Sequence, residues 1–173
     1  MVLAIGSILT GIAIPSLAGL VARQRSQGAV QRLVATLHQA RDEAIKRNGR
    51  VVVCKSADAL SCSQSAGWEQ GWLMFQDRNN NAQADPGEPL IAQSGALPRG
   101  LRLRGNGPVA NYISYGPNGA ARMVSGAFQA GTIMVCPLAR GEVPPTRIIL
   151  SGTGRPRVGP ASTADCAIPG TGS

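Results

Sequence analysis

The chain has 173 residues, of which 43% are apolar, 15% are charged and 3% are aromatic. This length corresponds to one domain with an appendage, and the apolar content excludes a disordered protein. With 22 glycines and 12 prolines, the composition favours short strands and turns over long helices. The formal net charge of +8 makes a polyanion a reasonable partner.

Residues 1–22 carry no charged side chain. About 20 apolar residues in a helix span the hydrocarbon core of a bilayer, so we expect this segment to be the membrane half of a long helix. The alternatives are a cleaved signal peptide, a buried core helix, and a stretch that looks long only because alanine and glycine are mildly apolar. A signal peptide would have a basic start and would be followed by a new fold, whereas here the helical pattern continues.

Residues 23–49 form the amphipathic second half of the predicted helix. Apolar residues recur at the i, i+3, i+4, i+7 spacing of one helical face, and arginines lie on the other faces. The helix should end near Asn48 and Gly49, since both residues tolerate the left-handed conformation that closes helices. The apolar positions are Val30, Leu33, Val34, Leu37, Ala40, Ala44 and Ile45.

Residues 50–173 are predicted to form a β-rich globular domain with a basic C-terminal tail. Short runs of β-branched and aromatic residues alternate with turn sequences such as 116–119. Their spacing suits a small antiparallel β-sheet or β-sandwich packed on the amphipathic half-helix, so the predicted fold class is α+β. The predicted strands are 51–54, 72–75, 89–93, 101–104, 112–115, 132–136 and 147–151.

The cysteines indicate the compartment. They include no Cys-x-x-Cys pair, and the single histidine, His38, lies in the predicted helix, so a zinc site is disfavoured. Disulfides in an oxidising periplasm fit better, although four reduced buried cysteines are an alternative. Of the three possible connectivities we favour Cys54 with Cys62 and Cys136 with Cys166, because each bond would clip a loop or tail to its own neighbourhood.

Two segments carry a family resemblance. Residues 3–17 are similar to the first helix of type IV pilins, whose apolar half is both membrane anchor and filament core. Residues 68–81, WEQGWLMFQDRNNN, resemble a segment that the FimT/GspH family of type IV pilin-like proteins carries after its first cysteine pair. The resemblance extends to the strand predicted at 132–136. It implies a minor pilin of the inner membrane, with a single membrane helix and a periplasmic globular domain, which later enters a pilus.

Pilin precursors also carry a short basic leader, a glycine cleavage site and a glutamate near the start of the mature helix, none of which precedes the apolar run in this sequence. We therefore expect the natural chain to begin upstream of Met1. A basic leader would also balance Arg23 and Arg25, which would otherwise mark a cytoplasmic side under the positive-inside rule. The resemblance implies other pilins as partners through the N-terminal helix, and inner-membrane lipid before assembly.

The segment after residue 76 has the oxygen spacing of an EF-hand-like calcium loop. Position 6 of such a loop calls for glycine, where this sequence has Ala82, and a strand instead of a helix is predicted to enter it. We therefore favour a hairpin connection held by its own side chains, with calcium as the alternative and no cofactor expected. The candidate calcium ligands are Asp77, Asn79, Asn81, Gln83, Asp85 and Glu88.

Arginine is concentrated toward the C-terminus. Residues 91–173 hold eight arginines and no lysine, against Glu142 and Asp165. Arginine suits bidentate recognition of phosphate oxygens, although a genomic GC bias would also replace lysine by arginine. The eight are Arg99, Arg102, Arg104, Arg122, Arg140, Arg147, Arg155 and Arg157.

Within this set, the sequence 154–157, Gly-Arg-Pro-Arg, presents two guanidinium groups on backbone that proline keeps out of the helical region. It resembles the G-R-x-R motif of FimT-type minor pilins, whose tail binds DNA during uptake for natural transformation. A solvated basic turn is the alternative. The resemblance implies nonspecific contact with DNA phosphates, led by Arg155 and Arg157. Further candidates, if they share the same surface, are Arg147, Arg122, Arg102 and Arg104.

Three function classes remain. The first is a DNA-receptor minor pilin of a type IV pilus, which supports pilus assembly and DNA uptake. The second is a structural pseudopilin of a type II secretion system, similar to GspH, without DNA binding. An enzyme is disfavoured, because the only histidine lies on the helix and no serine or cysteine has a visible base partner.

Overall fold

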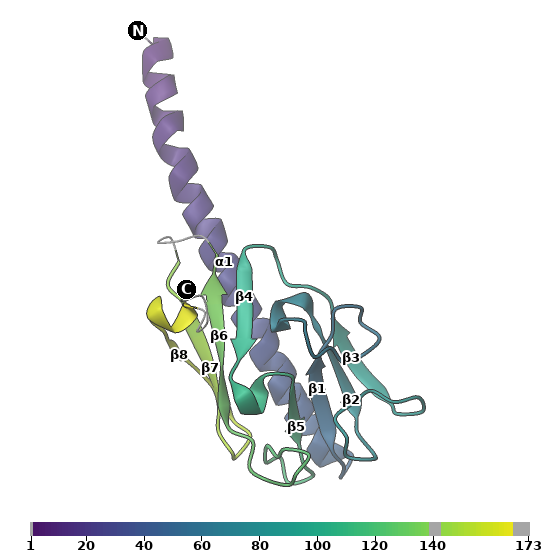
Figure 1. Cartoon of the computed structure of the whole chain (residues 1–173). Coiled ribbons are helices and arrows are strands. Elements are labelled where there is room, and N and C mark those ends of the chain that lie inside the picture. The colour runs from purple at the N-terminus through teal and green to yellow at the C-terminus, as the bar shows by residue number, and fades with distance from the viewer. Residues whose placement is uncertain (1, 139–142, 168–173) are drawn as a thin grey trace, which may run out of the picture.

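The computed structural model describes residues 2–138 and 143–167, with side chains from residue 19 onward. One long helix, α1 (Val2–Lys46), leads into two sheets of four strands each. Figure 1 shows the first half of α1 projecting beyond the sheets, while the second half lies against them. The predicted α+β fold, a long helix on small antiparallel sheets, is confirmed.

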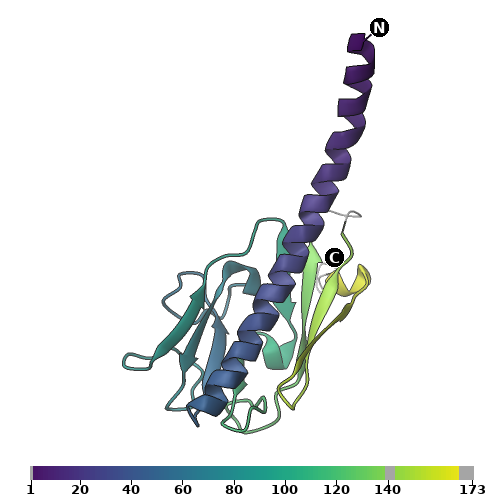
Figure 2. The same ribbon diagram turned by 180° about the vertical axis from the view of Figure 1, so that it is seen from behind.

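The second half of α1 buries a stripe of small and aliphatic side chains at helical spacing. These side chains form one core with residues of both sheets. Figure 2 shows α1 running across the two sheets from behind. Because one helix covers both sheets, the two sheets share a core instead of folding around separate ones. The stripe consists of Ala29, Val30, Leu33, Leu37, Ala40 and Ala44.

α1 ends where the sequence predicts. Asn48 adopts a left-handed φ of 46°, and the N–H of Gly49 donates to the carbonyl of Ala44 at 3.1 Å. This closes the last turn and directs the chain into the first strand.

The apolar beginning of the chain is helical and continuous with the amphipathic half, as predicted. Over the described part of the chain, no helical stretch combines the length and the apolar character needed to cross a bilayer. The membrane half expected for residues 1–22 therefore stays a prediction.

The first sheet has the order β3-β2-β1-β5, with every neighbouring pair antiparallel. One face packs on α1, and the other carries a smaller apolar cluster that includes Val52, Leu73 and Phe75. The strands are β1 (Val51–Lys55), β2 (Trp72–Gln76), β3 (Leu90–Ser94) and β5 (Tyr112–Tyr115).

The tryptophan-rich segment joins this sheet to the helix. Trp68 lies in a short 3-10 turn, η1 (Trp68–Gln70), and its indole N–H donates to the carbonyl of Val109 at 3.1 Å. Trp72 donates to the hydroxyl of Thr36 on α1 at 3.1 Å, and the Arg32 guanidinium lies 5.8 Å from its ring centroid. Both indoles are buried and hydrogen-bonded, so this family-like segment has a structural role.

The second sheet has the order β4-β6-β7-β8, again antiparallel throughout. All seven predicted strands are present, with boundaries that differ by about one residue. The eighth, β8, was not predicted, because its sequence of proline, glycine and arginine reads as a turn. The strands are β4 (Leu101–Gly105), β6 (Gly131–Pro137), β7 (Thr146–Leu150) and β8 (Pro156–Pro160).

Two disulfides clip loops to these sheets, and they join the same cysteines that we favoured from the sequence. Cys54 on β1 bonds Cys62, which lies in the following loop. Cys136 on β6 bonds Cys166, which lies in the 3-10 turn η3 (Ala164–Cys166) after β8. The second bond therefore holds the end of the described chain against the middle of the second sheet.

Candidate nucleic-acid interface

Strand β4 turns its two arginines away from the core. Leu101 and Leu103 are buried, whereas Arg102 and Arg104 between and after them are exposed. Successive side chains of a strand point to opposite faces, so both arginines lie on the outer face of the second sheet.

The pairing of residues between neighbouring strands shows which other side chains lie on this outer face. Arg104 pairs with Met134, Met134 pairs with Arg147, and Arg147 pairs with Gly159. Directly paired residues project to the same side, which places Arg147 beside Arg104 with one strand between them, about 10 Å apart.

Arg157 joins the same face from β8. It pairs with Ile149, two residues along β7 from Arg147, and is exposed. The outer face of the second sheet therefore gathers four arginines, which we call the arginine face: Arg102, Arg104, Arg147 and Arg157.

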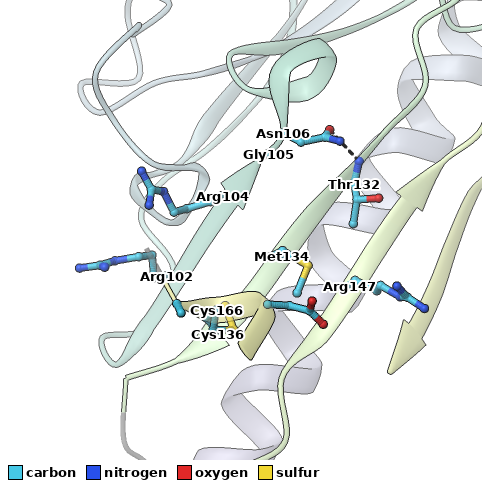
Figure 3. A pocket seen from close by; sticks show the side chains of 11 residues that line it. Arg102, Arg104, Gly105, Asn106, Thr132, Met134, Cys136, Arg147 and Cys166 are labelled. Carbon is cyan, nitrogen blue, oxygen red and sulfur yellow. Dashed lines mark hydrogen bonds between the residues drawn. A yellow bond between two sulfur atoms is a disulfide. The ribbon is translucent and has the colours of Figure 1, made fainter. Parts of the chain in front are cut away.

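A hollow of about 520 Å³ lies on the arginine face. In Figure 3, Arg102 and Arg104 lean to one side of it and Arg147 leans to the other, toward β8. The side-chain oxygen of Asn106 accepts a hydrogen bond from the N–H of Thr132 at 3.0 Å. Cationic groups thus flank a floor of small polar and thioether side chains.

Asp165 is the acidic group in this hollow. The Ser162 N–H and hydroxyl each donate to its carboxylate at 2.9 Å. These hydrogen bonds, together with the charge of Arg147, lower the pKa of Asp165. The carboxylate is therefore ionised near neutral pH and offsets part of the positive charge of the arginine face. The Cys136–Cys166 bond keeps it there.

Arg155 lies in the tight connection between β7 and β8. The N–H of Ser151 donates to the Arg155 carbonyl at 3.4 Å, and the N–H of Gly154 donates to the Ser151 carbonyl at 2.8 Å. Arg155 and Arg157 are exposed, while Gly154 and Pro156 between them are buried. The two arginines of the Gly-Arg-Pro-Arg sequence thus project to the same side of the hairpin, two residues apart.

Of the remaining C-terminal arginines, the DNA-binding candidate Arg122 does not join this face. The Arg122 guanidinium lies 4.5 Å from the ring centroid of Phe128 and donates to the Gly126 carbonyl at 3.0 Å. Arg99 is exposed in the loop before β4. Arg140 lies outside the described residues.

A second hollow, of about 490 Å³, borders Arg102 and Arg104 on their other side. Its lining includes the buried residue Lys55, whose ammonium donates to the Gln64 carbonyl at 3.3 Å. Burial lowers the pKa of Lys55, although the charge of Glu69 opposes that effect. The two arginines of β4 therefore form a ridge between the two hollows.

The candidate calcium loop is held by its own side chains. The buried Asp77 carboxylate accepts the N–H groups of Asn80, Asn81 and Ala82 at 2.7, 3.2 and 3.1 Å. The side-chain amides of Asn79 and Asn81 donate to Asp85 at 2.8 and 2.7 Å.

Glu88 closes the same loop by accepting the N–H groups of Arg78 and Asp85 at 2.7 and 3.3 Å. The carboxylate oxygens predicted as calcium ligands thus serve as internal acceptors. Among the described residues, no three His, Cys, Asp or Glu side chains are grouped so as to hold a metal ion. Calcium binding stays the untested alternative to the hairpin connection that we favoured, and this arrangement does not favour it.

The family model described as type II transport protein GspH matches residues 29–154. This chain belongs to the GspH family. The match begins at residue 29 within the second half of α1 and includes both disulfide-bearing strands and the arginines of β4 and β7. It ends at residue 154, so Arg155, Arg157 and β8 lie beyond it. No curated protein sequence matches this GspH-family chain significantly.

Two solved structures show the same fold. The type IV minor pilin FimU of Pseudomonas aeruginosa is 16% identical, with a TM-score of 0.58, and the comparison covers 82% of this chain and 92% of FimU. The minor pseudopilin EpsH from the type II secretion system of Vibrio cholerae is 14% identical, with a TM-score of 0.53, over 79% of this chain and 97% of EpsH. The GspH-family chain thus has the type IV pilin-like fold that the sequence resemblance implied.

Sequence reasoning missed Asp165 and Phe128 as neighbours of the candidate arginines. Asp165 precedes Cys166, and the favoured disulfide to Cys136 could have placed it over β6. For Phe128 the useful signal was its rarity, since the chain has only two phenylalanines.

Proposed function

We propose that this GspH-family chain is a minor pilin of a type IV pilus that binds DNA nonspecifically through its arginine face and Arg155, and thereby supports DNA uptake in natural transformation. The observation that carries the proposal is the strand register, which aligns Arg102, Arg104, Arg147 and Arg157 on one exposed surface. Guanidinium groups so placed neutralise phosphates and release counterions.

The arrangement favours contact with the phosphate backbone over recognition of bases. The arginines lie on strands of a four-stranded sheet, and Asp165 is the acidic side chain that lines the hollow between them. No helix presents these side chains for insertion into a major groove, as far as the described residues extend. Binding should therefore be insensitive to sequence and steeply dependent on salt.

We further propose that residues 1–22 anchor the chain in the inner membrane, that the domain predicted for residues 50–173 faces the periplasm, and that α1 joins other pilins in the filament. The uncharged run over 1–22 supports the first point. The two disulfides support the second, because such bonds persist in an oxidising compartment.

The test is a gel-shift titration of a short duplex over a range of salt concentrations. We expect Arg155→Ala/Arg157→Ala to weaken binding and to flatten the log–log salt dependence by about 2, since two phosphate contacts are lost. Lys46→Ala/Arg78→Ala is the matched control, because it removes the same charge from exposed positions outside the arginine face. A salt slope equal to wild type in the arginine variant would refute the role of this hairpin.

A structural pseudopilin of a type II secretion system is the second candidate. It is supported by the family match, whose model describes a type II transport protein, and by the fold shared with EpsH. Wild-type protein that fails to shift DNA at moderate salt would favour this role over the DNA receptor.

A further inference from the structure

Phe128 is an exposed aromatic side chain in a chain that has few. The chain contains two tryptophans, two tyrosines and two phenylalanines. In the described part of the chain, Phe128 is the one member of this group in the exposed class, at 65%. Exposure of a phenyl ring costs free energy that burial would recover, so its position calls for an explanation.

A small hairpin fixes this ring in place. Arg122 and Phe128 face each other in an antiparallel bridge. The N–H of Met123 donates to the Ala127 carbonyl at 2.8 Å, and the N–H of Gly126 donates to the Met123 carbonyl at 2.9 Å. The ring is therefore carried by hydrogen-bonded backbone, not by a loose loop.

Arg122 lies over the ring. Its guanidinium carbon is 4.5 Å from the ring centroid, and its Nη1 donates to the Gly126 carbonyl at 3.0 Å. This hydrogen bond holds the guanidinium in place, so that a positive charge lies beside the aromatic ring. The ring retains most of its exposure despite this contact.

The hairpin that carries Arg155 is the other neighbour of the ring. A Cβ placed on Gly152 would lie 3.4 Å from Cβ and Cδ1 of Phe128. Figure 1 shows the segment after β5 and the β7–β8 connection meeting at the end of the domain opposite the N-terminus. An aromatic ring therefore lies between Arg122 and the turn that bears Arg155.

We propose that Arg122 and Phe128 form a stacking platform for an unpaired base of single-stranded DNA, with Arg155 holding an adjoining phosphate. This platform rests on the proposed DNA-binding function and adds to it a preference for single-stranded over duplex DNA. Exposed aromatic rings flanked by cations bind single strands by base stacking, which every base can supply. A paired base within a duplex cannot reach the ring without leaving its stack.

The experiment measures fluorescence anisotropy of a 12-nucleotide oligo-dT, the same oligonucleotide with abasic sites, and a 12-base-pair duplex. We expect Phe128→Ala to weaken oligo-dT binding by about fivefold to a hundredfold and to leave duplex binding within about twofold. Wild type should prefer oligo-dT to the abasic strand, and Phe128→Ala should bind the two equally. Phe128→Trp should retain the preference.

Leu60→Ala is the matched control, because Leu60 is an exposed apolar residue at 81% on the loop over the first sheet. It should change none of the three affinities. Unchanged oligo-dT binding in Phe128→Ala, or equal losses on oligo-dT and duplex, would overturn the platform. If the platform is overturned but Arg155→Ala/Arg157→Ala still weakens duplex binding, the proposed DNA-binding function stands without the platform. Wild type that binds none of the three probes would refute both proposals.

Discussion

Gly154 holds the turn that presents Arg155 and Arg157. It has a left-handed φ of 82°, and a Cβ there would overlap the Gly119 carbonyl oxygen and lie 3.1 Å from Cε1 of Tyr115. Both contacts come from a segment more than 30 residues earlier in the chain, so the turn is docked as well as bent. Only glycine satisfies the two requirements together.

We expect Gly154→Ala to destabilise the domain by more than the roughly 1–2 kcal/mol that the left-handed backbone alone costs an alanine. Gly87→Ala is the control, because Gly87 has a φ of 89° but no atom within 4 Å of its Cβ position. The measurement is the free energy of unfolding from denaturant titration. Equal losses of unfolding free energy in the two variants would contradict tight packing around Gly154.

At this scale, the exposure of the two arginines of β4 could be predicted from the sequence, whereas the surroundings of Arg122 and Asp165 could not. Alternation of leucine and arginine over 101–104 already implies one polar face. The contact of Arg122 with Phe128 was not predicted, although both residues lie in one short hairpin, because no strand was predicted over 122–128. Asp165 required knowledge of which cysteine its neighbour bonds.

Among the elements, β8 decides how the C-terminal arginines are displayed. Its five residues pair along their whole length with β7, so the backbone of the Gly-Arg-Pro-Arg sequence continues a sheet. Local propensity argued against a strand, because proline and glycine weaken strands in isolation. Pairing with β7 and contact with α1 override that preference.

The disulfide between β6 and η3 is the second element-scale feature. It closes a loop of sequence separation 30 that contains both β7 and β8. We expect Cys136→Ala/Cys166→Ala to lower the free energy of unfolding by about 3–4 kcal/mol, because the unfolded chain regains that loop's entropy. Denaturant titration of the two oxidised proteins measures this difference. The intact Cys54–Cys62 bond serves as internal reference, and an unchanged midpoint would contradict a constraining role.

For the molecule as a whole, the second half of α1 is the common support of both sheets. The helix and its end were predicted from periodicity and from Asn48, since both signals are local. The strand orders of the two sheets, β3-β2-β1-β5 and β4-β6-β7-β8, were not predictable, because pairing between distant strands leaves no local trace.

We expect Leu37→Ala to destabilise the whole domain by about 2–5 kcal/mol, since this fully buried side chain lies in the core that both sheets share. Hydrogen exchange should report equal losses of protection for amides of β2 and β7. His38→Ala, at the exposed neighbouring position, should change stability by less than about 0.5 kcal/mol. Loss of protection confined to one sheet would show that the sheets unfold separately.

The prolines at both ends of β8 have a consequence for the molecule among its neighbours. The unpaired edge strand of a sheet can form hydrogen bonds with a strand from another chain, which would extend the sheet. Pro156 and Pro160 lack the amide hydrogens that such an added strand would need as donors, and Arg157 adds charge between them. Neighbouring copies of the chain are thereby kept from pairing through β8, so contacts between them must be made by other surfaces.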